Sequence, residues 1–306
     1  VVAVMPTREV IGWWAAVILV IARLVQGFAT GGEYGTSATY MSEAATANRR
    51  GFLSSFQYVT LVGGHVLAQF TLLVALHFLD TEALSDWGWR IGFFIGGIAA
   101  LVVLWIRRSM DESLSESHLE AIREGKDQGA GSLKTLFTVH WRPLLLVFLI
   151  TAGGTVAFYT YSVNAPAIVK STFGSDRALT ATWVNLAGLI FLMLLQPVGG
   201  LISDRVGRKP LLIFFGVSGV LYTYVLLTVL PNTTSALMAF LVLAVGYIII
   251  TGYTSVNAIV KAEVFPAEIR ALGVGLGYAL ANSAFGGTAP LLYQASKPDH
   301  ITLFIV

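Results

Sequence analysis

The stretch GLISDRVGRK, residues Gly200–Lys209, connects two long apolar runs at about 179–202 and 211–230. Each run has the roughly 20 apolar residues that a helix needs to cross about 30 Å of hydrocarbon. The glycines of the connection permit a tight turn and a close approach of the helices. Asp204 can accept hydrogen bonds from neighbouring basic groups or from a helix N-terminus. A generic basic loop would explain the arginines but not Asp204 or the glycine spacing, so the pattern favours a gating element.

The rest of the chain has the same apolar character. Of its 306 residues 56% are hydrophobic and 12% are charged, and the mean hydropathy is +0.75. A soluble domain carries about 25% charged residues, so the solvent of this chain is lipid. An all-α polytopic membrane protein is predicted, with eight spans at about 11–41, 51–79, 91–106, 144–169, 179–202, 211–230, 236–260 and 271–292, and the start of a ninth at 301–306.

The positions of the basic residues predict which ends of the spans face the cytoplasm. One set of loops holds 13 of the 19 Lys and Arg residues: Arg49, Arg50, Arg107, Arg108, Arg123, Lys126, Lys134, Arg142, Arg205, Arg208, Lys209, Lys261 and Arg270. The other set, with the N-terminal segment, holds five: Arg8, Arg90, Lys170, Arg177 and Lys297. Basic residues accumulate in cytoplasmic loops, so the larger set is assigned to the cytoplasm.

The organisation follows from one long polar stretch. Residues 107–143 are expected to form a cytoplasmic linker between a helical N-terminal half, 1–106, and a helical C-terminal half, 144–306. The net charge of +2 is too small to imply a nucleic-acid partner. The chain has no Cys, its five His show no metal-ligand spacing, and no HExxH, GxSxG or phosphate-binding loop occurs. We therefore expect no cofactor, no metal and no enzyme activity.

An internal repeat relates the two halves. Glu43 precedes Arg50 by seven residues, Glu263 precedes Arg270 by seven, and the two pairs are 220 positions apart. Such parallel repeats are typical of transporter halves. A partner of the segment 200–209 would fall before residue 1, so about three spans are expected to precede this chain.

Several motifs resemble the major facilitator superfamily, and within it the metabolite:proton symporter family. The segment 200–209 is similar to the superfamily's cytoplasmic signature loop, and Arg23–Gly27 (RLVQG) is similar to its fourth-helix motif. Longer similar stretches are RLVQGFATGGEYGTSATYMSE (23–43), GFLSSFQYVTLVGG (51–64), WGWR (87–90) and KAEVFPAEIRALGVGLGYALA (261–281).

The resemblance implies twelve helices in two halves that rock about a central site, of which this chain would hold helices four to eleven and the start of twelve. It implies a monomeric, multi-pass inner-membrane carrier that moves a small organic acid together with protons. The dicarboxylate α-ketoglutarate is the first candidate. Shikimate, citrate or a betaine- or proline-type osmolyte is the alternative, as is a non-transporting sensor that keeps the carrier fold.

Charged residues within spans are expensive and are therefore candidate functional residues. Arg23 and Glu33 are the two identified in this way. Arg23 could be a counter-charge for a substrate carboxylate or could bond to backbone carbonyls of an adjacent helix. Glu33 could load and release the proton or could be a hydrogen-bonded carboxylate near the inner vestibule.

Polar residues within spans, among them Tyr58, Tyr159 and Asn257, could line a hydrated cavity or make interhelical hydrogen bonds. Arg90 could attract substrate at the outer face, or could snorkel beside Trp87 and Trp89. His65 is expected to be a packed histidine.

The gating element comprises Gly200, Asp204, Arg205, Gly207, Arg208 and Lys209. The repeated pairs Glu43 with Arg50 and Glu263 with Arg270 are predicted to be inner-gate ion pairs, against the alternative of simple solvated loops.

Overall fold

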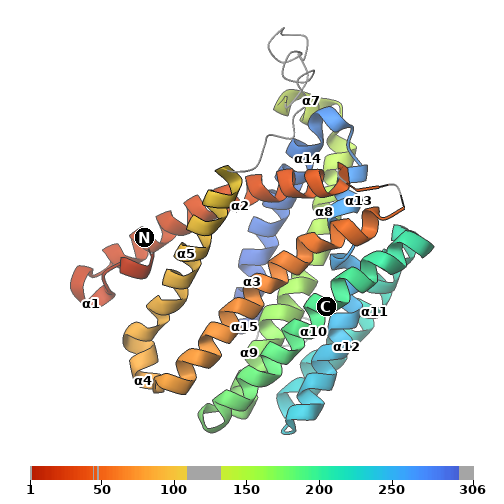
Figure 1. Ribbon diagram of the computed structural model, residues 1–306. Coiled ribbons are helices and arrows are strands. Elements are labelled where there is room, and N and C mark those ends of the chain that lie inside the picture. Colours follow the sequence, from red (N-terminus) through yellow and green to blue (C-terminus); the bar gives the residue numbers. More distant parts are fainter. Residues whose placement is uncertain (1, 44, 47, 109–131, 296–306) are drawn as a thin grey trace.

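The computed structural model describes residues 2–43, 45–46, 48–108 and 132–295. Most of the predicted central linker and the predicted ninth span lie outside the described residues. Every regular element among the described residues is helical (Figure 1). The first part of the chain forms η1 (Val2–Val4), α1 (Arg8–Ile11), α2 (Trp14–Glu43), α3 (Arg50–Phe78), α4 (Thr81–Ala83), the π-helical turn η2 (Leu84–Gly88) and α5 (Trp89–Arg108).

The second part follows the same pattern of long helices and short turns. It comprises α7 (Leu133–Thr138), α8 (Trp141–Tyr159), the π-helical turn η3 (Thr160–Asn164), α9 (Ala165–Phe173), η4 (Ser175–Arg177), α10 (Ala178–Val206), α11 (Arg208–Val229), η5 (Leu230–Asn232), α12 (Ala236–Thr254), α13 (Asn257–Glu263), η6 (Ala267–Ile269), α14 (Arg270–Ala281), the π-helical turn η7 (Asn282–Gly286) and α15 (Gly287–Ala295).

Seven helical segments of the described chain are long and apolar enough to cross a membrane. They correspond to the first seven predicted spans, and several extend about a turn further than the hydropathy indicated. The eighth predicted span is formed by α14, η7 and α15, which follow one another directly. The helices extend beyond the apolar runs because backbone hydrogen bonding continues outside the hydrocarbon, as in the polar residues 203–205 near the end of α10.

The internal repeat is visible in the element boundaries. Helix α2 ends at Glu43 and α13 ends at Glu263, while α3 begins at Arg50 and α14 begins at Arg270. The predicted offset of 220 residues therefore describes the same helix ends in both parts of the chain.

Two large helix contacts join the first part of the chain to the second, with smaller contacts of α13 against α2 and α3. Helix α3 runs beside α10 along much of its length, and α2 packs on α14 (Figure 1). One buried cluster combines Tyr58 and Val62 of α3 with residues of α8 to α12, and a second combines Tyr34 and Ala38 of α2 with residues of α7, α8, α13 and α14. These contacts place the boundary between the two parts at the centre of the helical assembly.

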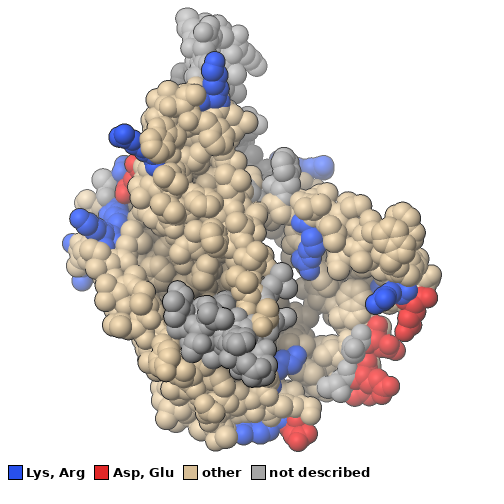
Figure 2. All heavy atoms as spheres, turned by 180° about the vertical axis from the view of Figure 1, so that it is seen from behind, with Lys and Arg blue, Asp and Glu red and all other residues tan. Residues whose placement is uncertain are grey.

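The outer surface is apolar where a soluble protein would be charged. Helix α5 exposes Leu101 by 67% and Trp105 by 72%. Figure 2 shows that most of the surface seen from behind is uncharged and that acidic side chains gather at the lower right, by the connection between α3 and α5. Exposed apolar area on this scale indicates contact with lipid or with other membrane helices.

Candidate functional site

The gating element binds the N-terminus of α3. The backbone N–H of Gly51 donates to Asp204 Oδ1 at 2.7 Å, and that of Phe52 donates to Asp204 Oδ2 at 2.9 Å. The carboxylate thus satisfies two of the N–H groups that every helix start leaves unpaired, at the positive end of the helix dipole. A helix N-terminus was one of the two partners expected for Asp204, and it lies in the other half of the chain.

Glycines bring the two backbones close enough for this bond. A Cβ atom at Gly200 would lie 2.6 Å from the carbonyl oxygen of Gly51, and a Cβ at Gly51 would lie 2.7 Å from the carbonyl oxygen of Gly200. Gly207, between α10 and α11, has a φ of 88°, which favours glycine. Of the remaining predicted members, Arg208 lies 3.9 Å from Asp204 Oδ1, and Arg205 and Lys209 are exposed.

The repeated acidic and basic residues are paired differently from the prediction. Arg270 Nη1 lies 2.6 Å from Glu43 Oε1, and Arg208 Nη2 lies 3.4 Å from Glu263 Oε1. The first pair joins α14 to α2 instead of joining Glu43 to Arg50 within one half. The pairing across the halves follows from the packing of α2 on α14. This packing brings the C-terminal end of α2, at Glu43, to the N-terminal end of α14, at Arg270.

A cavity of about 380 Å³ lies where α2, α3, α8 and α14 meet. Its polar lining combines hydroxyl, amide and imidazole groups from both parts of the chain. The lining residues are Gln26, Thr30, Tyr58, Leu61, Gly64, His65, Thr155, Phe158, Tyr159, Val163, Tyr278 and Asn282. The predicted residues Tyr58 and Tyr159 are among them.

Two π-helical turns border this cavity. Tyr159 directly precedes η3, and Asn282 is the first residue of η7. Gly286 of η7 lies against the Tyr159 ring, where a Cβ atom would come within 2.8 Å. Single π-helical turns are frequent at functional sites because they redirect side chains and loosen the backbone hydrogen-bond ladder.

Next to the cavity lies a buried lysine that the sequence analysis missed. Lys261 is 0% exposed, and its Nζ lies 5.1, 5.9 and 5.0 Å from the ring centres of Tyr34, Tyr253 and Tyr278. The Tyr34 hydroxyl accepts hydrogen bonds from Asn257 Nδ2 at 2.8 Å and from Lys261 Nζ at 3.4 Å. We call these five residues the tyrosine–lysine cage.

Lys261 was expected in a cytoplasmic loop, but it is buried within α13, so the expectation that only Arg23 and Glu33 lie inside spans is wrong. Lys261 directly follows the apolar run 236–260, and the hydropathy change there suggested a loop. The helix continues to Glu263, so Lys261 points inward. The repeat could have revealed this position. Helix α2 continues to Glu43, so its counterpart α13 should continue to the equivalent Glu263 and include Lys261.

Arg23 and Glu33 lie on α2, and both are exposed in the described structure. Arg23 Nη1 donates to Gln26 Oε1 at 3.0 Å. Residues 23, 26, 30 and 33 follow helical spacing along one stripe of α2, and two of them, Gln26 and Thr30, line the cavity. This spacing puts Arg23 and Glu33 at opposite ends of the stripe.

Arg90 and Asn257 lie away from the cavity lining. The Arg90 guanidinium donates to the carbonyl oxygens of Ala3 and Met5 at 3.2 and 3.0 Å and lies over the Trp89 ring. Asn257 is 0% exposed and belongs to the tyrosine–lysine cage. His65 lines the cavity, and its Nδ1 is buried without a hydrogen-bond partner.

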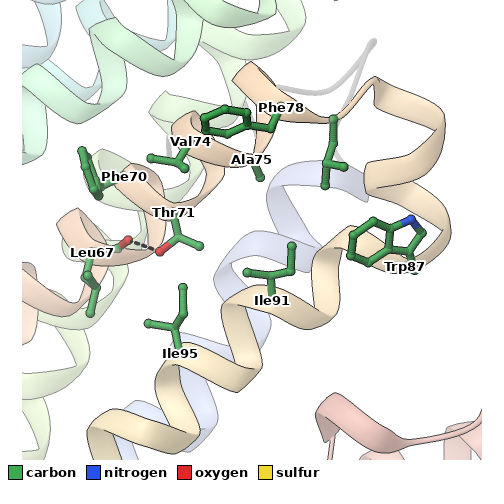
Figure 3. A pocket seen from close by; sticks show the side chains of 10 residues that line it. Leu67, Phe70, Thr71, Val74, Ala75, Phe78, Trp87, Ile91 and Ile95 are labelled. Carbon is green, nitrogen blue, oxygen red and sulfur yellow. Dashed lines mark hydrogen bonds between the residues drawn. The ribbon is translucent and has the colours of Figure 1, made fainter.

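A second hollow has a different character. Figure 3 shows an apolar groove of about 440 Å³ between α3 and α5, lined by residues that include Leu67, Phe70 and Ile95. Its one hydroxyl, on Thr71, donates to the carbonyl oxygen of Leu67 at 2.8 Å. Apart from this hydroxyl and the Trp87 indole N–H, the groove is lined by apolar groups, and it suits an acyl chain or another helix.

The membrane helices form two repeated sets that meet around a polar cavity. At one end an aspartate of one set is hydrogen-bonded to a helix N-terminus of the other, and this arrangement defines a polytopic carrier. The sequence matches the Major Facilitator Superfamily over residues 2–290, and the chain belongs to this superfamily. It is a multi-pass protein of the inner membrane.

The chain is 44% identical over 297 residues to an alpha-ketoglutarate permease of Escherichia coli, covering 97% of this chain and 67% of that protein. It is 31% identical to a citrate-proton symporter of Klebsiella pneumoniae, covering 96% of this chain and 65% of the relative. It is 32% identical to the ectoine/proline transporter ProP of Corynebacterium glutamicum, covering 96% and 60%. The chain thus spans about two thirds of the length of these relatives. No solved structure matches it significantly.

Proposed function

We propose that the complete protein is a secondary active transporter that moves a small organic acid together with a proton by alternating access, with α-ketoglutarate as the substrate. The observation that carries this proposal is the polar cavity between the two repeated sets of helices. Its volume of about 380 Å³ falls in the range of about 300–1,000 Å³ that is typical of small-molecule sites. The similarity to an alpha-ketoglutarate permease and to a citrate-proton symporter supports an organic acid.

Contacts between the two parts of the chain lie at the end of the helices that the distribution of basic residues assigns to the cytoplasm. The Tyr34 and Tyr278 rings stack with centres 3.6 Å apart, joining α2 to α14. The Asp204 bond to α3 and the Arg270 pair with Glu43 lie at the same end. We infer that these contacts form the inner gate and that the described state is closed toward the cytoplasm. Movement of the two halves would break them together.

Within this scheme, Arg23 and Glu33 are our candidates for substrate attraction and proton coupling. Their support is the α2 stripe that they share with Gln26 and Thr30 of the cavity wall. Tyr58, Tyr159 and Asn257 are proposed to position the substrate, the first two as cavity lining and Asn257 through Tyr34. Arg90, bonded to the N-terminal segment, is proposed to act at the outer entrance. The proposed assembly is a monomer of two halves, divided by the linker at residues 107–143.

One alternative substrate class has its own structural support. Tyrosine rings bind quaternary ammonium groups, and Tyr58, Tyr159 and Tyr278 line the cavity. A betaine- or proline-type osmolyte, as carried by the relative ProP, would exploit them. The Lys261 side chain beside this cavity, a cation once it is protonated, favours an anion instead.

The test uses the full-length carrier that contains this chain. Uptake of labelled α-ketoglutarate into proteoliposomes is measured with and without an inward proton gradient, with unlabelled citrate, shikimate and proline as competitors. Gradient-dependent uptake that α-ketoglutarate blocks is the expected result. Uptake that depends on the gradient but is specific for another competitor would replace the substrate, and absence of any uptake would support the non-transporting sensor.

A further inference from the structure

Lys261 is a fully buried lysine whose described neighbours supply no carboxylate to pair with it. No carboxylate of the described residues forms an ion pair with it, and among those residues its hydrogen bond is the long one, 3.4 Å, to the Tyr34 hydroxyl. Glu263, two residues further along, is paired with Arg208 instead. Transfer of an ammonium group out of water is costly unless it is paired, and ring faces repay only part of that cost. Such an arrangement is uncommon for a residue that serves packing alone.

The cage is assembled from both parts of the chain. Tyr253, Asn257, Lys261 and Tyr278 belong to α12, α13 and α14, whereas Tyr34 belongs to α2. Tyr34 covers the cage by stacking on Tyr278 and by accepting the bonds from Asn257 and Lys261. Separation of α2 from α14 therefore removes one wall of the cage and leaves the ammonium and the Asn257 amide as donors without their acceptor.

The cavity and the cage share one residue. Tyr278 lines the cavity, and the centre of its ring also lies 5.0 Å from Lys261 Nζ. A solute in the cavity is thus separated from Lys261 by the Tyr34–Tyr278 pair. The same movement that would open the cytoplasmic end would join the two spaces.

We propose that Lys261 binds a carboxylate of the transported acid, which takes the place of the Tyr34 hydroxyl as acceptor from Lys261 and Asn257 when the two halves part on the cytoplasmic side. This inference rests on the proposed function and makes it more specific. Lys261 becomes the residue that selects a dicarboxylate over an acid with one carboxylate. The caged state holds the Lys261 amine away from water until the two halves part.

The experiment compares the wild-type full-length carrier with Lys261→Met in detergent. Lys261→Met removes the charge and keeps a long unbranched side chain, and Lys170→Met, at an exposed lysine at the end of α9, is the matched control. Binding of α-ketoglutarate and of 2-oxopentanoate, which has the same chain length and one carboxylate, is measured together with the melting temperature. We expect Lys261→Met to bind α-ketoglutarate about 30-fold more weakly or worse, because a buried partner of a charge is lost.

The preference for the dicarboxylate separates binding from packing. If Lys261 binds the second carboxylate, Lys261→Met loses most of the preference for α-ketoglutarate over 2-oxopentanoate and keeps its melting temperature. If Lys261 is structural, the melting temperature falls and the preference is retained, which overturns the inference while α-ketoglutarate transport stands. If the wild-type carrier binds neither acid, the proposed substrate fails, and the inference fails with it.

Discussion

The Asp204 contact with α3 allows a quantitative prediction about the inner gate. Two charge-assisted hydrogen bonds, at 2.7 and 2.9 Å, connect α10 to the first turn of α3. Bonds to a charged group contribute about 1.5–3 kcal/mol each. Asp204→Asn keeps one acceptor and loses the charge, so we expect it to destabilise the closed gate by about 2 kcal/mol. That free energy corresponds to about a 30-fold shift of the equilibrium toward the state open to the cytoplasm.

The assay is labelling of a single cysteine behind the gate. The 306 residues contain no Cys. Ser54 is 1% exposed and lies one turn after Gly51 on α3, so Ser54→Cys places a thiol behind the contact. The rate of its modification from the cytoplasmic side should rise by about 30-fold in Asp204→Asn. The control is Glu268→Gln, which removes an exposed carboxylate at the same end of the helices. An increase of less than about threefold, or an equal increase in the control, would refute the reasoning.

Three further predictions concern the same structure. Glu43→Gln should raise the labelling rate of Ser54→Cys by less than about fivefold, because the pair with Arg270 is partly exposed and such ion pairs contribute about 0.2–1 kcal/mol. A rate increase as large as that of Asp204→Asn would contradict this prediction. Gly200→Ala should lower the melting temperature and open the gate, because its Cβ would overlap the Gly51 carbonyl. The control Gly216→Ala has open space around it and should be neutral or stabilising. Equal melting temperatures of the two variants would argue against the close approach of the backbones. Tyr159→Phe should raise the KM for α-ketoglutarate by about fivefold, the value of one hydrogen bond, and an unchanged KM would remove its hydroxyl from the binding site.

The repeat shows which features of the structure could be predicted from the sequence alone. The apolar runs predicted the helices, because length and hydropathy are local properties that lipid imposes on each span separately. The spacing of Glu43 and Arg50, repeated at Glu263 and Arg270, predicted equivalent helix ends in the two halves. The partners of these residues could not be predicted, because spacing does not state which helix of the other half lies opposite.

The amino-acid sequence by itself determined the membrane spans, the repeat, the family and the presence of a carboxylate able to hold a helix N-terminus. The tertiary structure alone decided that this carboxylate, Asp204, holds α3, that Arg270 pairs across the halves, and that Lys261 lies in a cage of tyrosines. The physical reason is that the hydrocarbon acts on each helix individually and can be recognised along the chain. Charge pairing and burial depend on which faces of distant helices meet, and that is established only when the helices pack.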